Sequence, residues 1–329
     1  MRTDTVSSSL SKRLRTVGVL ALLAAVLACT STVVDRSARP RDPARTWEAQ
    51  MVRAQRFHRQ GIYTSAEHQY GLALETSRSF ESGDPRIVET LTRRAELRLS
   101  QGHYAGAEDD YQAVLAAERS NPRDQGAALA DALNNLAVFY SDLDRISEAE
   151  ALLTEAIEIR TAIYGSEHPF VAVLLQNLGD AERRAENYPT AEALLVRALS
   201  IYATAGKTFF REASIAQNTL ARVYLATDRA QESEQNHLDA IRLSIKAGGE
   251  RNTDVGVFSR DLAALYTEQS RFPEAENLYR GSISILRDRL GSSSYQLSKS
   301  YRAYSAMLRA AGREREAAEY RERADATGY

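Results

Sequence analysis

The sequence predicts an all-α protein, an α-solenoid built from consecutive helix–turn–helix units. Apolar residues recur at helical spacing, small residues return at a step of about 42 residues along most of the chain, and 17 glycines and 7 prolines in 329 residues are few enough for a helical chain. We expect one array over residues 47–329, because a solenoid grows by adding units to one continuous core.

Residues 133–159 show the repeating unit most clearly. They read LNNLAVFYSDLDRISEAEALLTEAIEI, in which the apolar residues of each half fall on one face of a helix. Asp144 and Arg145 mark the turn between the halves, and Ser147 with Glu150 predicts a capping box at the start of the second helix. Because a lone helix pair of this size cannot bury its apolar faces, it needs neighbours of the same kind.

Three sets of small residues that recur once per repeat, here called columns, indicate that such neighbours are present. All members but Val114 are Ala, Gly or Ser. The columns are Ala54, Ala95, Ala137, Gly179, Ala221, Ala263 and Ser305; Ala66, Ala107, Ala149, Ala191, Ser233, Ala275 and Ala317; and Ala73, Val114, Ala156, Ala198, Ala240, Ser282 and Ala324. Since small side chains let two helix backbones approach closely, we expect each helix to nest against the next.

A column of larger residues accompanies the small ones. Its members are Tyr70, Tyr111, Leu153, Leu195 and Tyr279. We expect these side chains to fill the space between the close contacts. His237 and Arg321 break the column.

This pattern resembles the tetratricopeptide repeat, and the 42-residue step resembles its kinesin light chain variety. The phrases LNNLAVFY, EAEALL and YGSEHPFVAVLLQNLG carry the same resemblance. It implies a right-handed superhelix of about seven repeats, in which the first helix of each repeat lines a concave surface. In arrays of this kind, polar ladders on that surface bind peptides.

Candidate binding residues lie on the faces of the first helices that packing does not require. They are Asn134, Asn135, Gln176, Asn177, Asn218, Arg184, Arg222, Arg260 and Arg302. An asparagine amide carries both a donor and an acceptor, so it can hold an extended peptide backbone. Arginine forks can pair with carboxylates. We therefore expect a peptide-binding groove that favours extended segments with an acidic end. The alternative is that these side chains are simply solvated.

No catalytic motif accompanies this pattern. The five histidines are scattered among the repeats without metal-ligand spacing, and no GxSxG, GxGxxG or P-loop sequence is present. A net charge of −2 with mixed signs does not favour nucleic acid as a partner. We expect a non-enzymatic protein with no cofactor, no metal and no small-molecule substrate.

The first 46 residues differ from the rest of the chain. Lys12, Arg13 and Arg15 precede an uncharged apolar run over residues 17–28, and Cys29, the only cysteine, follows directly. This arrangement resembles a bacterial lipoprotein signal. The resemblance implies cleavage after residue 28 and a lipid on Cys29. Residues 29–46, rich in arginine and proline, are then a flexible tether.

Two other interpretations of the N-terminus remain open. Residues 16–34 carry no charge and are about long enough to form an uncleaved anchor helix. An ordinary signal peptide with an incidental cysteine is the third possibility. Because Thr30 rather than aspartate follows the cysteine, the lipoprotein resemblance implies the outer membrane of a bacterial envelope, facing the periplasm.

Two classes of function follow from these features. The first is a binding module tethered to the envelope, which docks a peptide or protein partner in its groove. The second is a structural subunit of an envelope assembly or secretion machine, with permanent contacts through its sides and ends.

Overall fold

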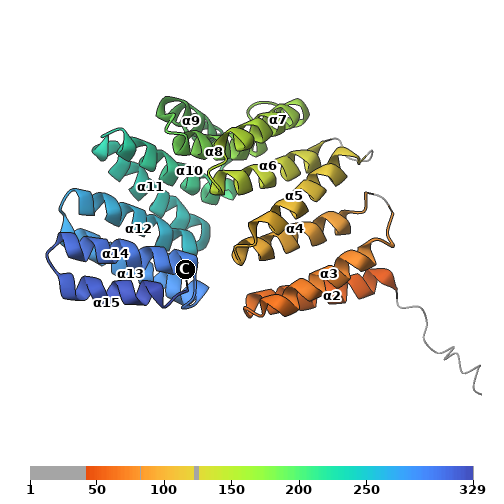
Figure 1. Cartoon of the computed structure of the whole chain (residues 1–329). Helices are drawn as coiled ribbons and strands as arrows, with labels where there is room; N and C mark the ends of the chain where they lie inside the picture. The colour runs from red at the N-terminus through yellow and green to blue at the C-terminus, as the bar shows by residue number, and fades with distance from the viewer. Residues whose placement is uncertain (1–41, 82, 122–125, 329) are drawn as a thin grey trace, which may run out of the picture. The chain divides into compact units, whose positions relative to one another are not determined.

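The computed structural model describes residues 42–81, 83–121 and 126–328, and everything below concerns these residues. They contain α-helices, one short 3₁₀ helix over residues 207–209 and no strand, so the all-α prediction is confirmed (Figure 1). The helices are α2 (Pro43–Arg59), α3 (Tyr63–Ser77), α4 (Pro85–Ser100), α5 (Tyr104–Arg119), α6 (Ala127–Asp142), α7 (Ile146–Tyr164), α8 (Pro169–Arg184), α9 (Tyr188–Ala205), α10 (Phe210–Ala226), α11 (Ala230–Gly248), α12 (Thr253–Glu268), α13 (Phe272–Leu290), α14 (Tyr295–Ala310) and α15 (Glu314–Asp325).

Consecutive helices pair as the repeat predicts. The chain divides into two compact units, residues 1–80 and residues 81–329. In the described part of the first, α2 pairs with α3; in the second, the pairs run from α4/α5 to α14/α15, and each pair contacts the next along the chain. The α-solenoid is therefore confirmed, while one continuous array over residues 47–329 stays a prediction.

Helix α2, the first among the described residues, begins earlier than expected. It starts at Pro43 rather than at residue 47, because the Asp42 carboxylate accepts a hydrogen bond from the Ala44 amide at 3.0 Å and proline suits the first helical position. Four residues that we expected in the tether are thus helical. The expected signal peptide over residues 1–28 and the expected lipid site at Cys29 lie outside the described residues.

The packing prediction is confirmed at every position of the three small-residue columns, all of which are buried. Gly179 shows how close the helices come, since a Cβ atom there would lie 2.9 Å from Leu195 Cγ. The five large residues of the fourth column are buried as well. Of the two residues that break this column, Arg321 is exposed, whereas His237 is completely buried.

Each first helix ends in the same left-handed turn. The residue at its centre has a φ between +57° and +75° in all seven pairs: Gly61, Gly102, Asp144, Glu186, Asp228, Ser270 and Gly312. The next amide reaches back to close a Schellman motif, as Arg145 N does to Tyr140 O at 2.9 Å. This turn leads directly into the second helix. As a result α7 begins at Ile146 without a side-chain cap, and the capping box expected at Ser147 was wrong.

The residue after the left-handed position is an arginine in four turns: Arg145, Arg229, Arg271 and Arg313, here called the turn arginines. Arg145 stacks on the Tyr140 ring at 3.9 Å and pairs with Glu148 of α7 at 2.5 Å. It also pairs with Glu108 of the preceding pair at 2.9 Å. The other three make the equivalent cross-pair contacts, to Glu192, Glu234 and Glu276. Each turn arginine therefore ties its own pair to the one before.

Candidate functional site

The predicted groove residues lie on first helices that contact one another. Within residues 81–329, α6 touches α8, α8 touches α10, α10 touches α12, and α12 touches α14 (Figure 1). Polar side chains join α6 to α8, α10 to α12 and α12 to α14, and Asp180 of α8 acts electrostatically on Arg222 of α10, so the five helices form a connected face. We call this surface of α6, α8, α10, α12 and α14 the first-helix face; its central residues are Asn134, Asp142, Asn177, Asp180, Arg184, Asn218, Arg222, Arg260 and Asp261.

Two asparagine contacts join neighbouring helices across this face. Asn177 Nδ2 of α8 donates to Asn134 Oδ1 of α6 at 2.7 Å. Asn218 Nδ2 of α10 donates to Asp261 Oδ2 of α12 at 2.9 Å. The amides that we expected to present to a peptide thus also hold the face together, so their orientation is set before any ligand arrives. Asn135 is exposed on α6.

Gln176 does not belong to this face. Its side chain is only 7% exposed and its Oε1 accepts a hydrogen bond from the Tyr202 hydroxyl at 3.3 Å. Tyr202 lies on α9, so Gln176 is directed into its own helix pair, and we do not include it in the site. Asn218 occupies the equivalent position on α10. It is also buried, but its amide reaches the face by its hydrogen bond to Asp261.

Two of the predicted arginines are engaged in ion pairs. Arg184 donates to Asp180 at 3.2 Å, to the Ser141 carbonyl at 3.0 Å and to Asp142 at 2.9 Å. Arg260 donates to Asp261 Oδ1 with Nε at 3.1 Å and Nη2 at 3.0 Å, and to Gln296 at 2.8 Å. These contacts fix both guanidinium groups on the face. Arg302 is exposed on α14.

Arg222 differs from those arginines. Its side chain is exposed, and no hydrogen bond or ion pair to another described residue holds it. The protein around it and the nearby Arg183 lower its pKa, while Asp261 and Asp180 act in the opposite direction. Burial acts to raise the pKa of both carboxylates, but the neighbouring arginines, Arg222 among them, outweigh burial and lower both. Arg222 thus acts on these carboxylates electrostatically, without a direct ion pair. Arg222 is therefore the cation on this face best placed to receive an outside anion.

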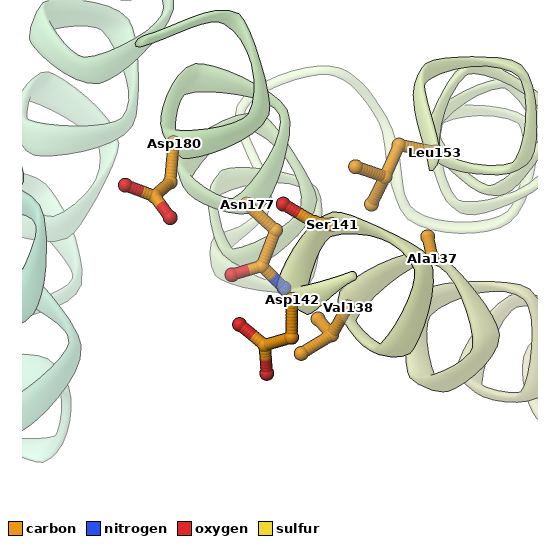
Figure 2. A pocket seen from close by; sticks show the side chains of 7 residues that line it. All are labelled: Ala137, Val138, Ser141, Asp142, Leu153, Asn177 and Asp180. Atoms are coloured by element: carbon orange, nitrogen blue, oxygen red, sulfur yellow. The ribbon is translucent and has the colours of Figure 1, made fainter. Parts of the chain in front are cut away.

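A small hollow lies beside this cluster, between α6 and α8. Its volume is about 70 Å³. Figure 2 shows aliphatic side chains on one side and carboxylates with an amide on the other; the lining residues are Ala137, Val138, Ser141, Asp142, Leu153, Asn177 and Asp180. The surrounding protein raises the pKa of Asp142, although Arg184 opposes the shift. The hollow has room for one small side chain of a segment lying on the face.

Sequence reasoning missed a buried residue beneath the face. His237 of α11 has no exposed surface, and its Nδ1 lies 2.9 Å from Asn218 Oδ1. Burial lowers its pKa to about 4; Asp261 opposes this shift and Arg222 reinforces it. The interruption of the large-residue column at this position was the signal that could have identified it.

The described residues offer neither a metal centre nor a membrane span. Among them, no three His, Cys, Asp or Glu side chains are grouped so that they could hold a metal ion. Within the same residues, no helix is both long and apolar enough to cross a bilayer.

Comparison with known proteins agrees with the helix-pair architecture. The sequence profile of the tetratricopeptide repeat matches residues 128–204 and 212–288. The comparison with curated protein sequences found no match. Aspartyl phosphate phosphatase F from Bacillus subtilis is 13% identical with a TM-score of 0.66, covering 87% of this chain and 70% of its own.

Two further solved structures are similar. A Rap protein solved in complex with Competence and Sporulation Factor is 16% identical with a TM-score of 0.54, over 84% of this chain and 76% of its own. A Podosopora anserina protein described as a kinesin light chain with nearly identical TPR-like repeats is 22% identical with a TM-score of 0.50, over 61% of this chain and 95% of its own. Identities this low show the fold alone. Together with the sequence profile, they establish that residues 128–204 and 212–288 of this chain are tetratricopeptide repeats.

Proposed function

We propose that the protein is a non-enzymatic binding module whose first-helix face docks an extended, acidic segment of a partner protein. The observation that carries this proposal is Arg222, an exposed guanidinium without an ion-pair partner among the described residues. Asp180 and Asp261 act on Arg222 electrostatically but form no direct ion pair with it, so an incoming carboxylate can supply that ion pair.

The surroundings of Arg222 suit a peptide rather than a small molecule. Between Asn134 and Gln296, hydrogen bonds make three of the four helix-to-helix steps along the face, and Asp180 of α8 acts electrostatically on Arg222 of α10 at the remaining step. The hollow between α6 and α8 adds room for a side chain next to Asp180. The similar Rap structure contains a bound partner, Competence and Sporulation Factor, which supports a binding role for the fold.

Reversing the charge at Arg222 tests this proposal. We expect Arg222→Glu to weaken binding of a labelled peptide of alternating glutamate and alanine by about tenfold, roughly 1.4 kcal/mol, because attraction is replaced by repulsion. Fluorescence anisotropy with the full chain in mild detergent measures the effect. Wild-type affinity should also fall as salt is added.

The matched control is Arg197→Glu, the same change on the second helix α9, where the side chain is exposed and pairs with Glu167 at 3.6 Å. This variant should bind like the wild type. If both variants bind equally well, or if the wild type prefers the peptide with glutamine in place of glutamate, the acidic-ligand proposal is refuted. Stable co-purification with fixed partners and no peptide binding would favour the structural-subunit alternative.

We further propose that a lipid on Cys29 anchors this module to a bacterial envelope membrane, on the outer membrane facing the periplasm. This proposal comes from the sequence around Cys29, where the only cysteine follows a basic start and an apolar run. A lipoprotein anchor of this kind carries more than one acyl chain, which holds a protein stably where a single chain does not.

The substitution Cys29→Ser tests the anchor. We expect the variant to leave the membrane fraction or to remain uncleaved, since serine offers no sulfur for lipid attachment. Membrane fractionation combined with intact-mass measurement distinguishes these outcomes. A Cys29→Ser protein that is cleaved and still sediments with the membrane would show that the anchor lies elsewhere.

A further inference from the structure

His237 occupies a position that packing alone would give to an apolar side chain. The equivalent positions in the pairs before and after it hold Leu153, Leu195 and Tyr279. His237 is as buried as these residues, but its Nε2 has no hydrogen-bond partner among the described residues. Burying an unsatisfied polar atom costs free energy, so stability does not explain the histidine. Its one hydrogen bond, from Nδ1 to Asn218, points to the reason.

The direction of that hydrogen bond follows from Asp261. Arg260 and Arg222 help to lower the pKa of Asp261 against the effect of burial, so its carboxylate is ionised and can only accept. Asn218 must therefore turn its Nδ2 toward Asp261 Oδ2, at 2.9 Å. Its Oδ1 then faces His237, which requires the proton on His237 Nδ1. The donor and acceptor of each hydrogen bond in this series, which runs from α11 through α10 to α12, are thereby determined.

This series of hydrogen bonds helps to hold the Asp261 carboxylate in place. Oδ2 accepts from Asn218, and Oδ1 accepts the two-pronged contact from Arg260. Asp261 acts on Arg222 electrostatically but does not pair with it. If His237 no longer held Asn218, the amide could rotate, and the released carboxylate could turn toward Arg222.

We propose that His237 is a positioning residue: through Asn218 and Asp261, it keeps Arg222 unpaired and available to an acidic ligand. This inference rests on the proposed function for its purpose, although its structural claim, the availability of Arg222, can be measured without any ligand. It assigns to one histidine in α11 the control of a binding cation on the paired helix α10, by way of Asp261 on α12.

The decisive measurement is the rate at which phenylglyoxal, an arginine reagent, labels Arg222 in the full chain, followed by peptide mass spectrometry. His237→Leu introduces the residue that occupies the equivalent positions 153 and 195. We expect it to slow labelling about threefold to tenfold, which corresponds to the free energy of one hydrogen bond. Asn218→Ala breaks the same chain one link further on and should slow it similarly. His237→Gln, which keeps an N–H donor, should label more like the wild type.

Labelling of Arg197 on α9 in the same samples is the internal control and should not change. Affinity for the glutamate–alanine peptide should fall in parallel with Arg222 labelling, while affinity for the glutamine version should stay the same. If Arg222 labels at the wild-type rate in both His237→Leu and Asn218→Ala, the positioning role is refuted. Slower labelling in a protein that never binds the acidic peptide would support the positioning role and refute the proposed function instead.

Discussion

Lowering the pH from about 6.5 to about 4 is expected to remove about 3 kcal/mol from the free energy of unfolding through His237 alone. In the folded protein, burial lowers the pKa of His237 to about 4, whereas a histidine in an unfolded chain titrates near 6.5. Between these values the unfolded chain binds a proton that the folded protein does not. The contribution of neutral His237 to the free energy of unfolding is therefore fully present above about pH 6.5 and is lost as the pH drops toward 4.

Urea unfolding of the wild type and His237→Leu across this pH range measures the effect. Exposed carboxylates such as Glu148, Glu274 and Glu316 have lowered pKa values and lose their stabilising pairs at still lower pH, but they do so in both proteins and cancel in the difference. The wild-type curve should fall relative to the variant below about pH 6.5. Parallel curves would mean that His237 is protonated as easily in the folded protein as in the unfolded chain.

Enlarging a small-column residue is expected to have the next largest effect. Ala263 of α12 is completely buried, and its column is occupied by Ala, Gly or Ser in every pair. Ala263→Leu adds three carbon atoms at a close helix contact, which should cost about 1–3 kcal/mol through overpacking. The midpoint of urea unfolding at neutral pH should fall accordingly.

Ala306→Leu on α14 is the matched control, because the same substitution is made on an exposed first-helix position one pair later. It should change the unfolding midpoint little. A similar change at Ala54 should cost less than at Ala263, since α2 belongs to the terminal repeat. Equal losses at Ala263 and Ala306 would contradict the register of the columns.

The fold could be predicted because one physical requirement repeats seven times. A close helix contact excludes large side chains, so the Ala, Gly and Ser columns reveal both the pairs and their register. Helix boundaries were harder to predict from the sequence, because the left-handed turn accepts Asp144, Glu186, Asp228 and Ser270 as well as glycine. Only three of its seven positions hold the glycine that would have identified it.

The candidate site was predicted less completely. The residue types correctly indicated polar first helices, but the sequence could not tell that Asn177 bonds to Asn134 or that Gln176 turns inward to Tyr202. Those outcomes depend on side-chain directions between separate helices. Asp261 was missed because the sequence does not show that its carboxylate contacts Asn218 of the neighbouring first helix.

The ties made by the turn arginines are not present at every junction between helix pairs. At the fourth pair the equivalent residue is Asn187, whose amide bonds within its own pair to Glu182 at 2.8 Å. Glu150, the counterpart of Glu108 and Glu192, has no guanidinium from that turn, and burial together with Glu182 raises its pKa. In a one-dimensional chain of coupled units, one weak link sets where the chain breaks into blocks. The seam between α6/α7 and α8/α9 lacks the turn-arginine tie and is joined on the first-helix face instead, by Asn177 to Asn134 and by Arg184 to Ser141 and Asp142, so this link depends on the same surface that holds the hollow.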